Sequence, residues 1–302
     1  MSMINKKIAL AIVLITAVVF VNKTWITRTI VQTIKPKIIS DFSNKPYINN
    51  EKYKTSSNIQ EKYNITLISD IHNNVVDLQS AIAKINQSDT QAVIVLGDLT
   101  NTGTRSELLT VKKTLGSLNK KYYVIAGDHD LWASREHTQN PQTIFDDIFK
   151  DHQLPPSISV KDINFIRVDN ADIYNGVSMD TIESLSKSLS KGISPQVIVS
   201  HKAIYNPLTL HKMGYINEKE NKLVLEQALK IQSIVKNATN QNVTLVNGDL
   251  HSFSKYKFLD TLHLVFNIGA ITKFKNFQNP RYAVLKHLLD GTVIVEDKQI
   301  YP

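Results

Sequence analysis

Short apolar runs alternate with longer amphipathic segments over most of the chain. Runs of about five residues rich in β-branched side chains predict strands at 65–69, 92–96, 122–126, 197–200 and 243–246. Apolar residues at helical spacing predict helices at 75–85, 106–118, 181–189 and 222–235. Short strands that alternate with longer helices are typical of βα units around a buried sheet.

The pattern changes after residue 250, where further apolar runs follow one another with no helix between them. They predict strands at 256–259, 262–268, 282–289 and 292–295, and Asp290-Gly291 is a hairpin-turn sequence. Mixed units followed by a strand-rich end predict an α/β (α+β) fold, a two-sheet β-sandwich flanked by helices. We place this domain at residues 64–302.

The first part of the chain has its own pattern. Residues 8–21 form an apolar run of 14 residues that follows Lys6 and Lys7. Three interpretations are open: an uncleaved anchor helix, a cleaved signal segment, or a buried or disordered terminus. We favour an N-terminal membrane anchor or signal segment over 1–26 and a polar basic stalk over 27–63. Lysines on both sides of the run give no clean orientation, and we expect the anchored domain outside the cytoplasm.

Charge is distributed unevenly along the 302 residues. Residues 1–63 carry ten Lys/Arg and three Asp/Glu, whereas the remainder carries 25 and 24. A nearly neutral domain argues against specific nucleic-acid binding, and a basic tail favours proximity to a membrane. The chain has no cysteine, which excludes a disulfide framework, a cysteine nucleophile and a thiolate zinc site.

Polar clusters follow five predicted strands at their carboxyl ends. They are Asp70-Ile71-His72, Gly97-Asp98, Gly127-Asp128-His129-Asp130, His201 and Gly248-Asp249-Leu250-His251. One such cluster is usually a turn or a structural histidine, but five in the same position predict a metal site, because ligands gather at strand ends in α/β sheets. Asp70 and His72 are two residues apart, so we expect both on one side of an extended segment, as for Asp249 and His251.

Together, and in this order, these motifs resemble the calcineurin-like metallophosphoesterase superfamily, over about residues 65–295. The family order is Asp-x-His, Gly-Asp, Gly-Asn-His-Asp/Glu, His and Gly-His-x-His. The resemblance implies a β-sandwich with two metal ions at its strand ends. It implies Asp70, His72 and His251 as ligands of the first metal, Asp98 as the bridging carboxylate, and Asp128, His201 and Asp249 at the second. His129 would then assist the leaving oxygen, with Asp130 orienting it.

Two positions depart from the family pattern: Asp128 replaces the Asn, and Asp249 replaces the first His of the last motif. Two divalent ions and two carboxylates would leave the family-like site doubly positive, whereas four carboxylates make this one neutral. We therefore expect a monoanionic phosphodiester to be preferred over a dianionic monoester. Oxygen-rich ligation favours Mn, Fe or Mg over Zn.

The expected activity is that of a metal-dependent phosphohydrolase, a phosphodiesterase that uses a dinuclear metal-bound hydroxide with His129 assisting the leaving group. Leu99-Thr100-Asn101 follows Asp98 in place of the Asp-Arg-Gly of the family's Ser/Thr protein phosphatases. This favours a small-molecule, nucleotide or lipid phosphoester substrate. The alternative is a catalytically weakened metal-binding member acting as a membrane-tethered binding or scaffold module.

Overall fold

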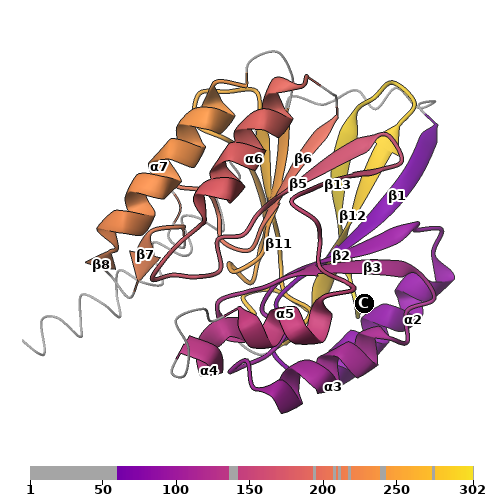
Figure 1. Cartoon of the computed structure of the whole chain (residues 1–302). Coiled ribbons are helices and arrows are strands. Elements are labelled where there is room, and N and C mark those ends of the chain that lie inside the picture. The colour runs from indigo at the N-terminus through magenta and orange to yellow at the C-terminus, as the bar shows by residue number, and fades with distance from the viewer. Residues whose placement is uncertain are drawn as a thin grey trace, which may run out of the picture. The chain divides into compact units, whose positions relative to one another are not determined.

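The computed structural model of the chain describes residues 60–135, 142–192, 195–206, 209, 212–216, 219–238, 243–273 and 276–301 (Figure 1). The chain divides into two compact units, Met1–Lys54 and Thr55–Pro302, and the fold described here is that of the second. The expected anchor, and the stalk up to residue 59, lie outside the described residues. Within the described ranges, no helix is both long enough and apolar enough to cross a membrane.

The first sheet has five strands in the order β13-β12-β1-β2-β3. Its bounds are β1 (Glu61–Ile68), β2 (Ala92–Leu96), β3 (Lys121–Ile125), β12 (Arg281–Leu288) and β13 (Val293–Gln299). The neighbours β1, β2 and β3 are parallel, and helices α2 (Val75–Gln87) and α3 (Arg105–Leu115) connect them. The predicted βα units of this half are confirmed, and β1 begins before residue 64.

The second sheet has six strands in the order β10-β11-β9-β6-β5-β4. Its bounds are β4 (Ser157–Val160), β5 (Ile163–Val168), β6 (Gln196–Ser200), β9 (Val243–Asn247), β10 (Phe253–Lys257) and β11 (Leu264–Ile268). The strands β5, β6 and β9 are parallel and are connected by α6 (Met179–Ser190) and α7 (Lys222–Lys236). The hydropathy pattern did not predict β4 or β5, because β4 is short and half-exposed and polar Asn164 and Arg167 interrupt β5.

The shorter elements lie mainly between β3 and β4. They are the 3-10 turn η1 (His129–Leu131), α4 (Trp132–Arg135), α5 (Thr143–Phe149) and the small hairpin of β7 (Tyr215–Ile216) and β8 (Lys219–Glu220).

A buried apolar core joins the two sheets face to face, with Leu67 and Ile94 from the first and Phe165, Val199 and Val246 from the second. Helices α2, α3 and α5 pack on the outer face of the first sheet, and α6 and α7 on that of the second (Figure 1). This confirms a mixed two-sheet α/β fold. It also sets the carboxyl ends of the parallel strands of both sheets around one rim.

Candidate metal centre

The chain turns sharply at each strand end that carries an expected ligand. Five of the expected ligands have left-handed backbone: Asp70 (φ 53°), His72 (φ 47°), Asp98 (φ 51°), Asp249 (φ 66°) and His251 (φ 51°). The expectation of extended Asp-x-His segments is therefore wrong, and side-chain alternation does not place these residues. Such backbone costs about 1–3 kcal/mol per residue and gathers at functional sites, where surrounding hydrogen bonds hold it.

Glycines let the strand ends approach each other closely. A Cβ on Gly127 would lie 2.1 Å from the backbone nitrogen of Asp98 and 2.2 Å from its Oδ1. Gly97 has φ 88°, and its Cβ would lie 2.6 Å from His201 Nδ1. The glycines before Asp98 and Asp128 are therefore steric requirements of the site.

One donor group consists of Asp70, His72, Asp98 and His251, all buried, with ligand atoms within 4.8 Å of one another. His72 Nε2 lies 3.1 Å from His251 Nε2 and 3.5 Å from Asp98 Oδ2. Burial, together with the neighbouring histidines, lowers the pKa of His72 to about 4 although the Asp70 charge opposes this. His72 is therefore neutral near pH 7, the form in which imidazole binds a metal.

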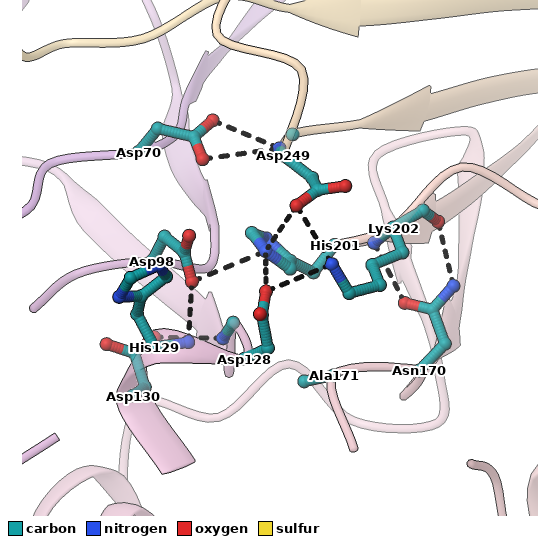
Figure 2. Close-up of polar contacts among 12 residues, drawn as sticks. Asp70, Asp98, Asp128, His129, Asp130, Asn170, Ala171, His201, Lys202 and Asp249 are labelled. Atoms are coloured by element: carbon teal, nitrogen blue, oxygen red, sulfur yellow. Dashed lines mark hydrogen bonds and ion pairs between the residues drawn. The ribbon is translucent and has the colours of Figure 1, made fainter. Parts of the chain in front are cut away.

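A second donor group consists of Asp98, Asp128 and His201 (Figure 2). His201 Nε2 lies 3.3 Å from Asp98 Oδ1 and 3.2 Å from Asp128 Oδ1. His201 Nδ1 donates to the carbonyl of Leu96 at 2.8 Å, which leaves Nε2 facing the carboxylates. Asp98 belongs to both groups, which is the position that a bridging carboxylate requires.

These donors fit divalent ions. Burial raises the pKa of Asp98 well above its ordinary range, and the charges of Asp128 and Asp70 add to this effect. A buried carboxylate of this kind needs a cation close by to remain ionised. The nitrogen and oxygen donors of each group lie close enough together to bind such a cation.

Asp249 lies beside these groups but is a member of neither. Its Oδ1 is 3.9 Å from His201 Nε2 and 2.9 Å from Lys202 Nζ, and its backbone N–H donates to Asp70. Lys202 Nζ also lies 3.1 Å from Asp128 Oδ1 (Figure 2). Sequence reasoning missed Lys202. Two features of the sequence could have indicated it: Lys202 directly follows His201, and the additional carboxylates Asp128 and Asp249 need a positive charge nearby.

One hydrogen bond and two ring contacts hold the His129 side chain in place. His129 Nδ1 donates to the carbonyl of Asn101 at 2.6 Å, so Nε2 is the ring nitrogen that this bond leaves available to a substrate. The His129 ring packs edge-on against His72 at 4.8 Å and against Trp132 at 5.1 Å between centroids. Its backbone N–H donates to Asp98 Oδ1 at 3.0 Å. His129 therefore lies at the edge of the candidate metal centre.

Asp130 does not orient the His129 ring directly, which corrects the expectation. Its buried carboxylate accepts hydrogen bonds from the backbone of Leu99, Thr100 and Gly127 and from the Thr100 hydroxyl. These bonds fix the loop that leads to Asn101, whose carbonyl holds His129. The effect of Asp130 on His129 therefore passes through the backbone.

The sequence of this chain is similar to those of known phosphoesterases. A sequence profile of the calcineurin-like phosphoesterases matches residues 63–235. A protein of Ruthia magnifica subsp. Calyptogena magnifica, named "Probable cyclic nucleotide phosphodiesterase", is 28% identical over 167 residues, which are 54% of this chain and 68% of that protein.

Solved structures share the fold at low sequence identity. The protein TT1561 of Thermus thermophilus aligns with a TM-score of 0.54 and 10% identity over 79% of this chain and 99% of its own. Purple acid phosphatase PPD1 from yellow lupin (Lupinus luteus) aligns with a TM-score of 0.53 and 12% identity over 80% of this chain and 52% of its own.

Proposed function

The chain belongs to the calcineurin-like phosphoesterase family and is thus a hydrolase acting on phosphoric esters; on this premise we propose that it is a phosphodiesterase for cyclic nucleotides or similar small phosphodiesters. One observation carries the proposal: Asp98 belongs to two donor groups, and the His129 ring lies at their edge. The alternative scaffold role predicts metal binding without turnover.

The proposed cofactors are two metal ions, with Mn, Fe or Mg preferred over Zn. Asp70, His72, Asp98 and His251 would hold the first, and Asp98, Asp128 and His201, with Asp249 beside them, the second. Bound there, such ions polarise phosphoryl oxygens and make water a stronger nucleophile near neutral pH. Carboxylates outnumber imidazoles around the second position, which supports the preference for hard ions.

His129 is the proposed proton donor to the leaving oxygen. Its Nδ1–H is engaged by Asn101, so a proton gained by the ring is carried on Nε2. Donation from Nε2 would neutralise the alkoxide that departs when the phosphorus–oxygen bond breaks. Asp130 holds the loop of Asn101, so its role is to keep the ring in position.

Site charge supports a diester over a monoester. Four carboxylates (Asp70, Asp98, Asp128 and Asp249) and the Lys202 ammonium lie at the centre. Two divalent ions would bring this set to a single positive charge, one unit less than in the family-like site, and this loss weakens the attraction of a dianionic monoester twice as much as that of a monoanionic diester. Relative to the family-like site, the two additional carboxylates remove two positive charges, and the Lys202 ammonium restores one of them.

Trp132 supports a nucleotide as substrate. Its side chain is half-exposed, 50% by area, and its ring lies beside His129. A flat apolar surface next to the proposed leaving-group histidine can stack against a nucleobase, and base–aromatic stacking contributes about 1–3 kcal/mol. The name of the Ruthia relative points to the same substrate class.

A hydrolysis screen of the full chain tests the proposal. Metal-depleted protein is supplied with Mn²⁺, Mg²⁺, Fe²⁺ or Zn²⁺ and given 3′,5′-cyclic AMP, bis(p-nitrophenyl) phosphate or p-nitrophenyl phosphate. We expect turnover of both diesters with Mn²⁺ or Fe²⁺ at rates above that of the monoester, and loss of turnover in Asp98→Asn. Metal binding without turnover of any ester would favour the scaffold role. Selective monoester hydrolysis with zinc would contradict the charge argument.

We also propose that residues 8–21 attach the protein to a membrane, with the domain outside the cytoplasm. The apolar run and the basic excess of residues 1–63 support this. Membrane fractionation tests the attachment, and recovery in the soluble fraction would contradict it. Protease treatment of intact cells tests the side, because an external domain is cleaved and a cytoplasmic one is protected.

A further inference from the structure

A lysine ammonium is built into the second metal position. Lys202 is only 7% exposed, and its Nζ lies 3.1 Å from Asp128 Oδ1 and 2.9 Å from Asp249 Oδ1 (Figure 2). Both carboxylates occupy the two positions at which the sequence departs from the family pattern. A long flexible side chain is immobilised here at an entropic cost, so its position calls for an explanation.

Several hydrogen bonds hold the main chain that carries this ammonium. The Asn170 amide donates to the Lys202 carbonyl at 2.7 Å and accepts from the Lys202 backbone N–H at 3.0 Å. The Ser200 hydroxyl donates to the same carbonyl at 2.9 Å. Asn170 is itself buried and follows β5, so the end of one further parallel strand serves to position Lys202.

The ammonium shares oxygens with the second donor group. Asp128 Oδ1 lies 3.2 Å from His201 Nε2 and 3.1 Å from Lys202 Nζ. Asp249 Oδ1 is nearer to Lys202 Nζ than to His201 Nε2, by 2.9 against 3.9 Å. A divalent ion held by Asp98, Asp128 and His201 would therefore lie close to a fixed positive charge that pairs with one of the same carboxylates, and this charge repels it.

The first donor group is different. Its four ligands are Asp70, His72, Asp98 and His251, whereas the ion pairs of Lys202 run to Asp128 and Asp249. The two positions are thus chemically unequal although they share Asp98.

We propose that Lys202 is a built-in cation that weakens the second metal position relative to the first, and that Asp249 serves chiefly to hold Lys202 in place. The inference rests on the metal centre of the proposed function and deepens it. Four carboxylates and one ammonium leave three negative charges, which one divalent ion reduces to one and a second converts to one positive charge. Lys202 therefore sets the metal concentration at which the centre becomes positive enough for an anionic ester.

Metal binding by the full chain, measured without substrate, tests this inference. Mn²⁺ titration of metal-depleted wild type by calorimetry should show one tight ion and a second bound at least about 10-fold more weakly. Lys202→Met, which keeps the unbranched side chain as far as Cε but removes the ammonium, should tighten the second ion by about 10-fold or more and leave the first nearly unchanged. Mn²⁺ electron paramagnetic resonance should then show coupled ion pairs at lower metal concentration.

Two further variants complete the experiment. Lys236→Met removes an exposed lysine paired with Asp260, and it should leave both affinities at the wild-type values. Lys202→Gln removes the charge but retains a hydrogen-bond donor, and it gives the answer if Lys202→Met fails to fold without metal. A second ion bound no more tightly in the Lys202 variants than in wild type overturns the inference. Loss of ester hydrolysis alone would count against the proposed function and not against these affinities.

Discussion

The Nε2 atoms of His72 and His251 lie 3.1 Å apart, although the two residues are 179 positions apart in the sequence and follow strands of different sheets. Two imidazole nitrogens that face each other at this distance repel unless a proton or a metal ion lies between them. Burial keeps His72 neutral near pH 7, so its Nε2 can offer a lone pair, and one metal ion could take the place of the hydrogen that the two rings share here.

Replacing His251 by Ala should remove the first metal position while keeping the fold. We expect Mn²⁺ affinity at that position to fall by on the order of 100-fold or more, with loss of turnover, because one of four donors is gone. Calorimetry measures the affinity, and circular dichroism checks the fold. Wild-type affinity and rate in His251→Ala would show that the site is wrongly placed.

His129→Ala should lower kcat by about 10²–10⁴-fold for diesters with an alkoxide leaving group. The effect should be much smaller for bis(p-nitrophenyl) phosphate, because p-nitrophenolate departs without a proton. The measurement is kcat for a series of diesters whose leaving groups differ in pKa, compared between the wild type and His129→Ala. Equal losses for both kinds of leaving group would assign His129 a role other than proton donation.

Trp132→Ala should raise KM for 3′,5′-cyclic AMP by about 5- to 150-fold, since stacking contributes about 1–3 kcal/mol per base. KM for dimethyl or other small dialkyl phosphates should change little. Steady-state kinetics with both substrates provides the comparison. A parallel rise for both would mean that Trp132 supports His129 through the contact between their rings and not the base.

Gly127→Ala should destabilise the domain by more than about 2 kcal/mol and disturb Asp98. The new Cβ would overlap backbone and carboxylate atoms of Asp98 at 2.1–2.2 Å, and neither can move freely. Gly116→Ala is the matched control, because its Cβ would meet its nearest atom at 3.2 Å in an ordinary helical conformation. Urea unfolding compares the two variants, and similar losses would argue against the close approach.

His263 should make stability fall in mild acid. Its Nδ1 accepts from the Val243 N–H at 3.1 Å and its Nε2 donates to the Val235 carbonyl at 3.0 Å. Burial lowers the pKa of His263, although the bond to Val235 opposes the shift. Below about pH 6.5 the unfolded chain therefore binds a proton that the folded chain does not, so the free energy of unfolding decreases as pH falls.

His263→Gln should remove this contribution, because glutamine does not titrate. Urea unfolding from about pH 5 to about pH 7.5 should give a shallower pH dependence in the variant than in the wild type. An unchanged slope would show that other groups cause the acid sensitivity.

Local sequence pattern placed the expected ligands at strand ends for a specific physical reason. Buried parallel strands read as continuous apolar runs, and Asp70, Asp98, Asp128, His201 and Asp249 stand directly after or close behind such runs. The topology of the sheets then brings these ends together. The strand β5 was not predicted because its polar residues break the run, and Asn170 behind it was missed for the same reason.

Lys202 could not be placed from the sequence because its role depends on two distant carboxylates. Its partners Asp128 and Asp249 are 74 and 47 residues away, and a lysine after a strand usually faces solvent. The left-handed turns at Asp70 and His72 were also beyond the pattern, since residue spacing describes regular backbone and not the turn that ends it.

The candidate metal centre lies where the two sheets meet, and hydrogen bonds connect the sheets there. His201 after β6 donates to Leu96 of β2, and the Asp249 N–H after β9 donates to Asp70 after β1. Ions bound by residues of both sheets would cross-link the sheets at this end of the sandwich. Amide hydrogen exchange in β2 and β6 should therefore slow together when metal is added. The two sheets would then open as one cooperative unit.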